Sequence, residues 1–521
     1  MPVFDPKTNR ISLKPSASSS FAAFPARRPR RHAACRTGSL AALAALMLLN
    51  GCKPVGPNYS RPSFNAPAKY KETGASTVIV PPPNPSGGGW TPANPSAGML
   101  KGQWWEIYQD PELDRLEARI ATNNVQLQAA MESYFAARDD VAAARANLYP
   151  FLSAGPAISR SKISANRSGA AHNAGATAYD FLFDGQASWE PDFWGRIRRT
   201  IEAARAGAQA SAADAANVAL SLQAEMATDY FDLRGLDSEA KLLTETVQEM
   251  QGQLALTQRL LKGGVDNESD VAQAQTQLDT TRAQLVDVGV ARAEYEHAIG
   301  TIANYDLSNF SIPPSPFDNL PLPKIPLGVP SQLLERRPDI AAAERLTDAA
   351  NAQIGIAISA FYPTIFLSGT GGFESAHPGT WIQGPSSLWS LGGQATELLF
   401  DAGQRHAVTA AAIDSYEAQV AAYRNTVFQA FDDVENQLSS LQILEQELSV
   451  EQQAVASAQN FFNISNLRFK GGVTSYLEVL TAEGILLQDQ STAISIRTSE
   501  FAASVGLVRS LGGGWDVTQL P

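Results

Sequence analysis

The chain has 521 residues, of which 44% are hydrophobic and 18% charged, and its formal net charge is −12. This hydrophobic share excludes wholesale disorder, and an acidic balance without a basic stripe beyond the leader argues against nucleic acid. The two cysteines, Cys35 and Cys52, both lie near the N-terminus, and the five histidines are scattered. We therefore expect no disulfide framework, no metal site, no cofactor and no enzymatic activity.

Residues 1–51 have the parts of a secretory signal. Five arginines between positions 27 and 36 precede the apolar run Leu40–Leu49, which is followed by Asn50-Gly51-Cys52. Ten helical residues cover only about half of the hydrocarbon core, so a transmembrane anchor is not expected. Leu49-Asn50-Gly51-Cys52 resembles a bacterial lipobox. The resemblance implies a covalent lipid on Cys52 and, with Lys53 next, sorting to the outer membrane.

Proline divides the rest of the chain. Residues 53–99 contain ten prolines and residues 313–330 contain seven, whereas none occurs between Pro191 and Pro313 or between Pro385 and Pro521. Because proline breaks helices, these stretches predict a lipid-anchored, extended N-terminal segment over 52–110 and a linker over 306–337. The proline-free stretches predict helices.

The two proline-free stretches are copies of each other. Lys262-Gly263-Gly264-Val265 recurs as Lys470-Gly471-Gly472-Val473, an offset of 208, and Leu148-Tyr149-Pro150 has a counterpart in Phe361-Tyr362-Pro363. The duplication predicts two repeats, 111–305 and 338–510, followed by a C-terminal tail over 511–521. Each repeat should contain a helix, two strands and two further helices.

The long helices are predicted over 195–261 and 403–469, and the helices that follow them over 267–305 and 475–508. Apolar residues recur at alternating spacings of four and three in the first copy, broken at Thr257; the second copy is broken at Glu451 and Ser465. A 67-residue helix is about 100 Å long, so we expect side-by-side helices in a rod or tube. The many alanines after position 203 would permit close packing, but ordinary helix propensity explains them too.

The strands are predicted over 148–190 and 361–400. Tyr179, Phe181, Phe183, Ala187 and Trp189 alternate with polar residues, as in a barrel strand between lipid and a wet lumen. In the second copy Trp389, Leu391, Ala395 and Leu399 repeat the pattern, with Glu397 as a break. The first strand alternates poorly. A soluble sheet is the alternative for any single strand, but the duplication favours a membrane barrel.

Four strands per chain cannot close a barrel, and an open edge cannot exist in lipid. Two chains would make an eight-stranded barrel filled by its own side chains, whereas three would make twelve strands and a channel. The predicted fold is therefore mainly α, with a long coiled-coil α-barrel continuous with a β-barrel of twelve strands in a trimer.

Several motifs along the mature chain resemble the TolC-like outer membrane factors, in their lipoprotein (NodT/OprM-like) branch. They are Val55-Gly56-Pro57-Asn58-Tyr59, Trp104-Trp105-Glu106, the stretch from Leu334 to Ile340, and Leu511-Gly512-Gly513-Gly514-Trp515. The resemblance implies a homotrimeric conduit in the outer membrane that meets a periplasmic adaptor and an inner-membrane, proton-driven efflux pump. Its cargo would be drugs and other toxic small molecules.

The resemblance also implies functional residues at the two helix turns. The turn residues expected to contact the adaptor are Gly263, Gly264, Val265, Gly471, Gly472, Val473 and Thr474. Asp270 and Glu478 occupy equivalent positions and would form a lumen constriction that selects cations. Alternatively, the glycines only turn the chain and Glu478 lies on a solvated face. Because Thr474 and Thr481 replace a base and an acid of some relatives, neither a tip salt bridge nor a double acidic ring is expected.

Two other classes of protein are compatible with parts of the sequence. A lipid-anchored periplasmic coiled-coil scaffold or adaptor without a pore explains Cys52 and the helices, but not the alternation over 179–190 and its recurrence. A lipoprotein hydrolase would need a catalytic constellation that the scattered histidines do not supply.

Overall fold

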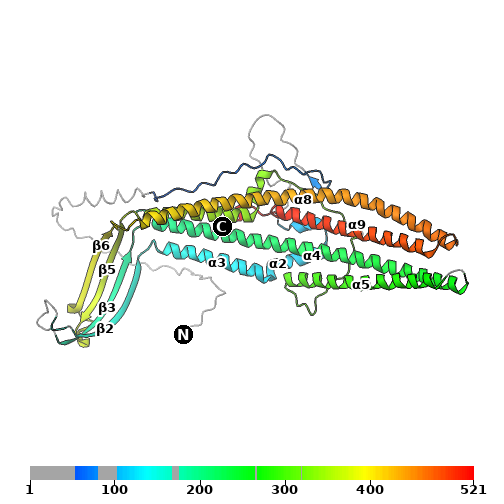
Figure 1. The fold of residues 1–521 in the computed structure, drawn as a ribbon. Coiled ribbons are helices and arrows are strands. Elements are labelled where there is room, and N and C mark those ends of the chain that lie inside the picture. The colour runs from blue at the N-terminus through cyan, green and yellow to red at the C-terminus, as the bar shows by residue number, and fades with distance from the viewer. Residues whose placement is uncertain (1–52, 80–101, 163, 167–174, 265–266, 318–319) are drawn as a thin grey trace, which may run out of the picture. The chain divides into compact units, whose positions relative to one another are not determined.

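The computed structural model describes residues 53–79, 102–162, 164–166, 175–264, 267–317 and 320–521, all within the unit Cys52–Pro521. The predicted signal 1–51, Cys52 and Val265 lie outside the described residues. The predicted order of two strands followed by two long helices is found twice (Figure 1).

The two long helices of the first repeat recur in the second repeat with the same lengths. Helices α4 (Arg196–Lys262) and α8 (Gln404–Lys470) each have 67 residues, and α5 (Glu268–Ile302) and α9 (Tyr476–Ser510) each have 35. All four bounds differ by the offset of 208. The sequence-based ranges deviate from them by at most three residues, because glycine pairs and the N-cap positions at 267 and 475 mark where the helices stop and start.

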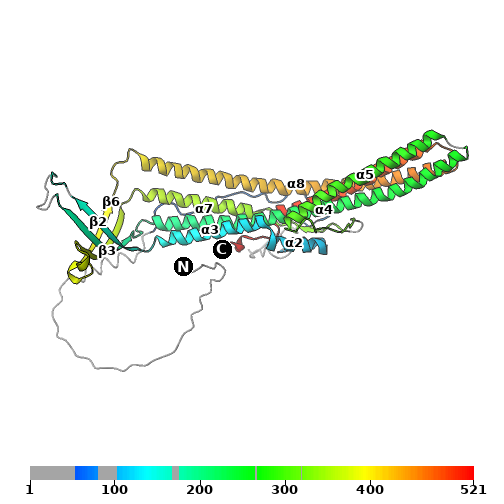
Figure 2. The ribbon, with the colours of Figure 1, turned by 90° about the horizontal axis from the view of Figure 1, so that it is seen from below.

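The helices lie side by side, with α4 against α5, α7 and α9, and α8 against α7 and α9 (Figure 2). The predicted seam is buried at Leu243, Val247 and Met250. Thr257 and Ser465, which were expected to break it, are 0% exposed and occupy matching positions. The Thr257 hydroxyl donates to the backbone of its own helix, so a polar residue enters the seam without an unsatisfied donor.

The segment before the strands differs between the repeats. One helix was expected in the first repeat, but the structure has two, α2 (Pro111–Asn123) and α3 (Val125–Ala146). Asn124 separates them in an extended conformation, and its side chain accepts from Leu127 N–H and donates to the Ile302 carbonyl. The second repeat has the short α6 (Leu333–Arg336) and then one uninterrupted helix, α7 (Pro338–Ser359).

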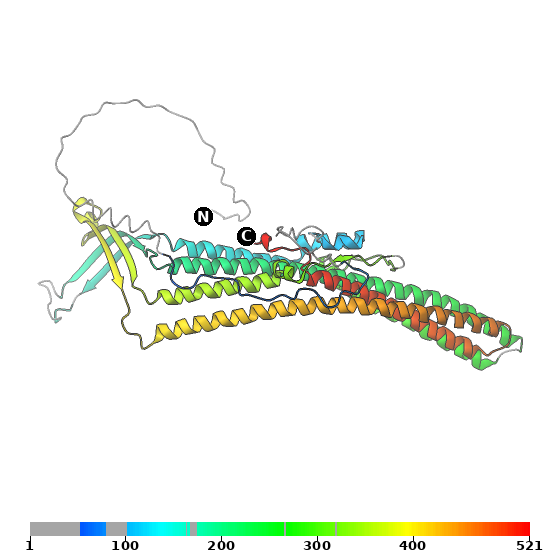
Figure 3. The same cartoon turned by 90° about the horizontal axis from the view of Figure 1, so that it is seen from above.

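Four antiparallel strands form one sheet in the order β2-β3-β5-β6 (Figure 3). They are β2 (Phe151–Lys162), β3 (Thr177–Trp189), β5 (Thr364–Ser375) and β6 (Ser387–Thr396). Within the described ranges, the expectation that each chain contributes a sheet of four strands is confirmed. The expected extent of the last strand is wrong, because β6 ends at Thr396. Glu397 and Leu399 therefore follow the strand, and Glu397 is not an acid on its apolar face.

The N-terminal segment is not extended throughout, contrary to the prediction for 52–110. Trp104–Tyr108 form a 3-10 helix, η1, whose aromatic residues are buried in the main core. There Tyr108 contacts Phe231 of α4 at 4.8 Å between ring centroids, and Phe231 contacts Phe501 of α9 at 4.7 Å. The core therefore joins this segment to both repeats.

The remaining elements are short. A two-residue parallel bridge pairs β1 (Val78–Ile79) with β4 (Ile325–Pro326). Four further 3-10 turns are η2 (Pro330–Gln332), η3 (Pro378–Thr380), η4 (Gly384–Ser386) and η5 (Val517–Gln519). Among the described helices, none is both long enough and apolar enough to span a membrane.

Candidate functional site

The sheet has one apolar and one largely polar face. Cross-strand partners point to the same side, and the register aligns Phe183 of β3 with Pro156 of β2 and Phe373 of β5. The apolar face comprises Leu152, Ala154, Pro156, Ile158, Phe181, Phe183, Ala187, Trp189, Ile365, Leu367, Phe373, Trp389, Leu391 and Ala395. The opposite face carries Ser153, Asp180, Asp184, Gln186, Thr370, Glu374, Ser390 and Gln394, with Phe151, Leu182, Phe366 and Leu388 as large apolar exceptions.

The register also explains why the first strand alternates poorly in sequence. Its apolar set Leu152, Ala154, Pro156 and Ile158 lies on the apolar face. The opposite face of this strand carries Phe151, Gly155 and Ala157 where polar residues would be expected. The alternation of apolar and polar residues is therefore not visible in the sequence. The pairing with β3 thus assigns a face that the strand's own pattern does not.

The second helix turn is a tight reversal built on Gly472. Its φ of +69° is left-handed, Gly472 N–H donates to the Phe469 carbonyl (2.9 Å), and Val473 N–H donates to the Arg468 carbonyl (2.9 Å). These two bonds define a Schellman motif, which satisfies the last carbonyls of α8. Gly264 also adopts a left-handed conformation after α4, with φ +72°, and its N–H donates to the Leu261 carbonyl (3.0 Å), as the Gly-Gly pairs predicted.

Glu478 connects α9 to α8 and to the turn. Its carboxylate accepts hydrogen bonds from Thr474, from Ser465 (3.3 Å) and from Arg468 (3.0 Å). The Thr474 hydrogen bond, the Arg468 charge and the Ser465 hydroxyl together lower the pKa of this carboxyl. The expectation of no salt bridge at the tip is wrong, because Arg468 supplies the cation that position 474 lacks.

The first turn does not copy this arrangement. Leu260 and Thr257 stand where the second repeat has Arg468 and Ser465. Here the Asn267 side chain caps α5 by accepting from the Asp270 N–H (3.0 Å). The equivalence of Asp270 and Glu478 thus holds for position in the helix and not for the groups that surround the two acids.

The two turns lie at the same end of the helices, opposite the sheet (Figure 1). They share an apolar cluster that includes Ala274 of α5, Phe462 of α8 and Val479 of α9. Tyr476 donates from its hydroxyl to Gln253 of α4 at 3.3 Å. The structure therefore brings together the turn residues that sequence analysis selected at positions far apart in the chain.

Sequence analysis missed Glu483, a buried acid of this region. It lies on α9, is 3% exposed, and neither carboxylate oxygen accepts a hydrogen bond from the residues that the structure describes. Burial raises the pKa of Glu483 to about 8, and Glu249 of α4 adds to the rise by repulsion, while the nearby Gln253 amide lowers it somewhat. The sequence contains a weak signal for it: the matching position of the first repeat is the neutral Gln275, the uncharged counterpart of this acid.

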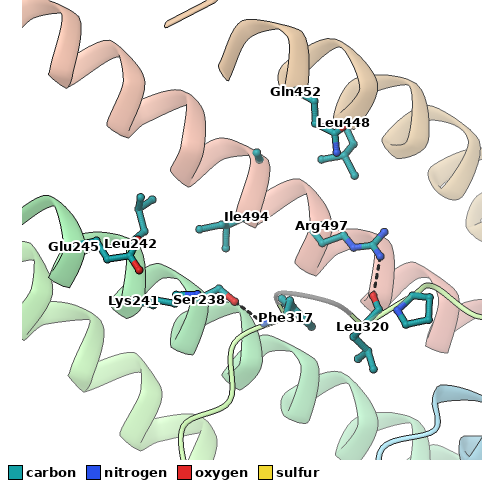
Figure 4. Close-up of a pocket in the computed structure, with 12 residues that line it drawn as sticks. Ser238, Lys241, Leu242, Glu245, Phe317, Leu320, Leu448, Gln452, Ile494 and Arg497 are labelled. Atoms are coloured by element: carbon teal, nitrogen blue, oxygen red, sulfur yellow. Dashed lines mark hydrogen bonds between the residues drawn. The ribbon is translucent and has the colours of Figure 1, made fainter. Parts of the chain in front are cut away.

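A cavity of about 630 Å³ lies between α4, α8, α9 and the linker, away from the turns (Figure 4). Ser238 accepts from Phe317 N–H (2.9 Å), and Arg497 donates to the Leu320 carbonyl (3.0 Å). The first bond attaches the linker to α4 and the second attaches it to α9. The cavity therefore lies where the linker packs on these helices. None of the predicted site residues that the structure describes lines it.

The chain resembles known outer membrane proteins over most of its length. The family model "Outer membrane efflux protein" matches residues 118–304 and 329–513. The pyoverdine export outer membrane protein OpmQ of Pseudomonas aeruginosa is 30% identical over 416 residues, which cover 79% of this chain and 87% of that protein. The toluene efflux pump outer membrane protein TtgC of Pseudomonas putida is 28% identical over 481 residues, with coverage of 92% and 96%. A solved structure of the outer-membrane channel OprN matches with a TM-score of 0.80 and 26% identity, covering 88% of this chain and 99% of that one.

Proposed function

Because this chain belongs to the outer membrane efflux protein family, we propose that it is the outer-membrane channel of a tripartite efflux system. It conducts small toxic molecules passively from a periplasmic adaptor and an inner-membrane pump to the exterior. The observation that carries this function is the sorting of side chains on the β2-β3-β5-β6 sheet, with an apolar face suited to lipid and a polar face suited to a wet lumen. A scaffold without a pore would not require a sheet with one apolar and one polar face.

The working unit is a homotrimer. One chain leaves β2 and β6 as the edges of its sheet, and unpaired edges are not tolerated in lipid. Three chains joined edge to edge make a closed barrel of twelve strands, and a threefold ring satisfies every edge with the same contact.

A lipid on Cys52 anchors each chain beside the barrel. Val55 N–H donates to the Trp194 carbonyl (2.9 Å), between the end of β3 and the start of α4. The buried guanidinium of Arg199 donates to the carbonyls of Val55 and Gly56, both at 3.2 Å. These bonds hold Val55 at the strand-to-helix junction, where the barrel would leave the membrane, so a lipid anchor three residues earlier in the chain suits this position.

The paired turns contact the adaptor. Leu467, Val473 and Leu477 are 70%, 69% and 55% exposed around the second turn, an apolar group that is unusual at the solvated end of a hairpin. The pump, driven by protons, supplies energy and cargo. Relatives are named for pyoverdine export and for toluene efflux. The cargo proposed for this channel is likewise a class of small molecules selected by the pump.

Asp270 and Glu478 restrict the lumen at the turns and favour cations. Single-channel conductance of the purified mature protein in a planar bilayer tests both the channel and the gate. We expect a cation-preferring pore that conducts little, and higher conductance or weaker cation preference in the Glu478→Ala and Asp270→Ala variants. The same contacts predict a pH dependence. Because the pKa of the Glu478 carboxyl is lowered, this group is ionised at neutral pH and keeps its contacts with α8. They are lost only as the pH falls through that lowered value, where conductance should rise.

The control is Glu447→Ala, which removes an exposed acid of α8 away from the turns. Pores that respond to none of the variants would leave the channel intact and refute the gate. A well-folded trimer that never conducts, with or without the turn variants, would refute the channel and leave the lipid-anchored scaffold as the better account.

A further inference from the structure

The charged residues of the four sheet strands are sorted by face. The strands contain two basic residues, Arg160 and Lys162, and three acidic ones, Asp180, Asp184 and Glu374. Arg160 is paired with Tyr179, which places it on the apolar side, and Lys162 lies two residues further along the same side. All three acids lie on the polar side. A solvated sheet has no reason to separate its charges in this way.

Arg160 and Lys162 also lie at a particular height on the apolar face. Arg160 follows Phe151, at the helix end of β2, by nine residues, which is about 30 Å along the strand. At the usual barrel tilt of about 40°, this corresponds to a height of roughly 23 Å, close to the full apolar band of about 25 Å. The two cations therefore lie at the far boundary of the band, where a basic residue costs little, and not at its centre.

The basic residues at the two ends of the sheet differ in their partners. At the helix end, Arg196 pairs with Glu190 and Arg405 pairs with Asp401, both at 2.6 Å. At the far end, Arg160 packs its guanidinium over the Tyr179 ring at 5.0 Å. Within the part of the chain that the structure describes, no carboxylate pairs with Arg160 or Lys162. The near-end cations are thus neutralised internally, whereas at the far end Arg160 rests on an aromatic ring and neither cation has a carboxylate partner among the described residues.

We propose that Arg160 and Lys162 form a binding site for the phosphate groups of outer-leaflet lipids, one site on each protomer. The inference rests on the proposed function, because it requires the apolar face to contact lipid. A guanidinium binds phosphate through paired hydrogen bonds and an ammonium adds a compact charge, while Tyr179 holds the guanidinium at the level of the headgroups. The site would fix the height of the barrel in the membrane.

The test is lipid binding by the purified, delipidated trimer, measured by native mass spectrometry with diphosphorylated lipid A and with dephosphorylated lipid A. The wild type should prefer the phosphorylated form. The R160Q/K162Q double variant should lose about 25-fold in affinity for it, from about fivefold for each basic residue near an anionic surface. The charge-conserving R160K/K162R variant should retain most of the affinity. R424Q removes an exposed basic residue of α8 and is the matched control.

Equal binding of both lipids by the wild type, or unchanged binding by the double variant, would overturn the proposal. Displacement of the lipid by millimolar inorganic phosphate would show a site for free phosphate, which also overturns it. Conductance of the same samples separates this failure from failure of the channel. Pores without lipid preference refute only the lipid site, whereas a trimer that never conducts refutes the channel and the lipid site together.

Discussion

Replacing Glu483 by glutamine should stabilise the turn region in a pH-dependent way. The side chain keeps its size, and the change removes only the possibility of a buried charge. Glu483 has a pKa of about 8 in the folded chain, against an ordinary value of 4.5. Between these values the folded protein keeps a proton that the unfolded protein has lost, so its stability falls by about 1.4 kcal/mol for each unit of rising pH.

The expected gain for Glu483→Gln follows from this slope. Below pH 4.5 both states of the wild type are protonated there, and the two proteins should be equally stable. At pH 7 the glutamine variant should be more stable by about 3 kcal/mol, and above pH 8 the difference should stop growing. The gain in stability should be confined to the part of α4 and α9 near the turns. Glu483 lies on α9 there, and Glu249, which repels it, lies on the facing helix α4.

Hydrogen exchange of the α4 and α9 amides near the turns, measured at pH 5 and pH 8, reports this difference directly. Wild type and variant are compared at the same pH, so the intrinsic exchange rates cancel. Glu447→Gln, on the exposed surface of α8, is the control for loss of an acid without burial. Equal protection of wild type and variant at pH 8, or a larger gain at pH 5 than at pH 8, would refute a buried carboxyl with a raised pKa.

Two further predictions concern the second helix turn and Asp237, which accepts a hydrogen bond from Ser315 N–H of the linker (2.8 Å). Gly472→Ala forces a side chain into a left-handed conformation and should cost about 1 kcal/mol, seen as faster proteolysis at this turn; Gly471→Ala, where φ is −84°, should cost much less. Asp237→Asn removes the carboxylate that Arg234 and Arg292 share at 3.1 and 2.7 Å. Arg292 keeps Glu296 at 2.9 Å, but the buried Arg234 loses its carboxylate partner, which should cost about 3 kcal/mol in thermal unfolding. A loss below about 1 kcal/mol would mean that solvent or other acceptors compensate the two cations.

The sequence by itself determined the elements whose signals are local. Absence of proline, the Gly-Gly pairs and the 208-residue offset predicted the four long helices to within three residues, because helix propensity and helix ends depend on near neighbours. The faces of β3 were equally clear, since alternation within a single strand is enough to assign them.

Only the tertiary structure decided which residues meet across the fold. The face of β2 follows from its pairing with β3, and the ion pair of Arg468 with Glu478 follows from the geometry of the α8–α9 turn. The burial of Glu483 depends on how α9 packs against α4, more than two hundred residues away in the chain. A duplicated sequence predicts equal backbones, but the environment of each matching side chain depends on contacts that the two copies no longer share.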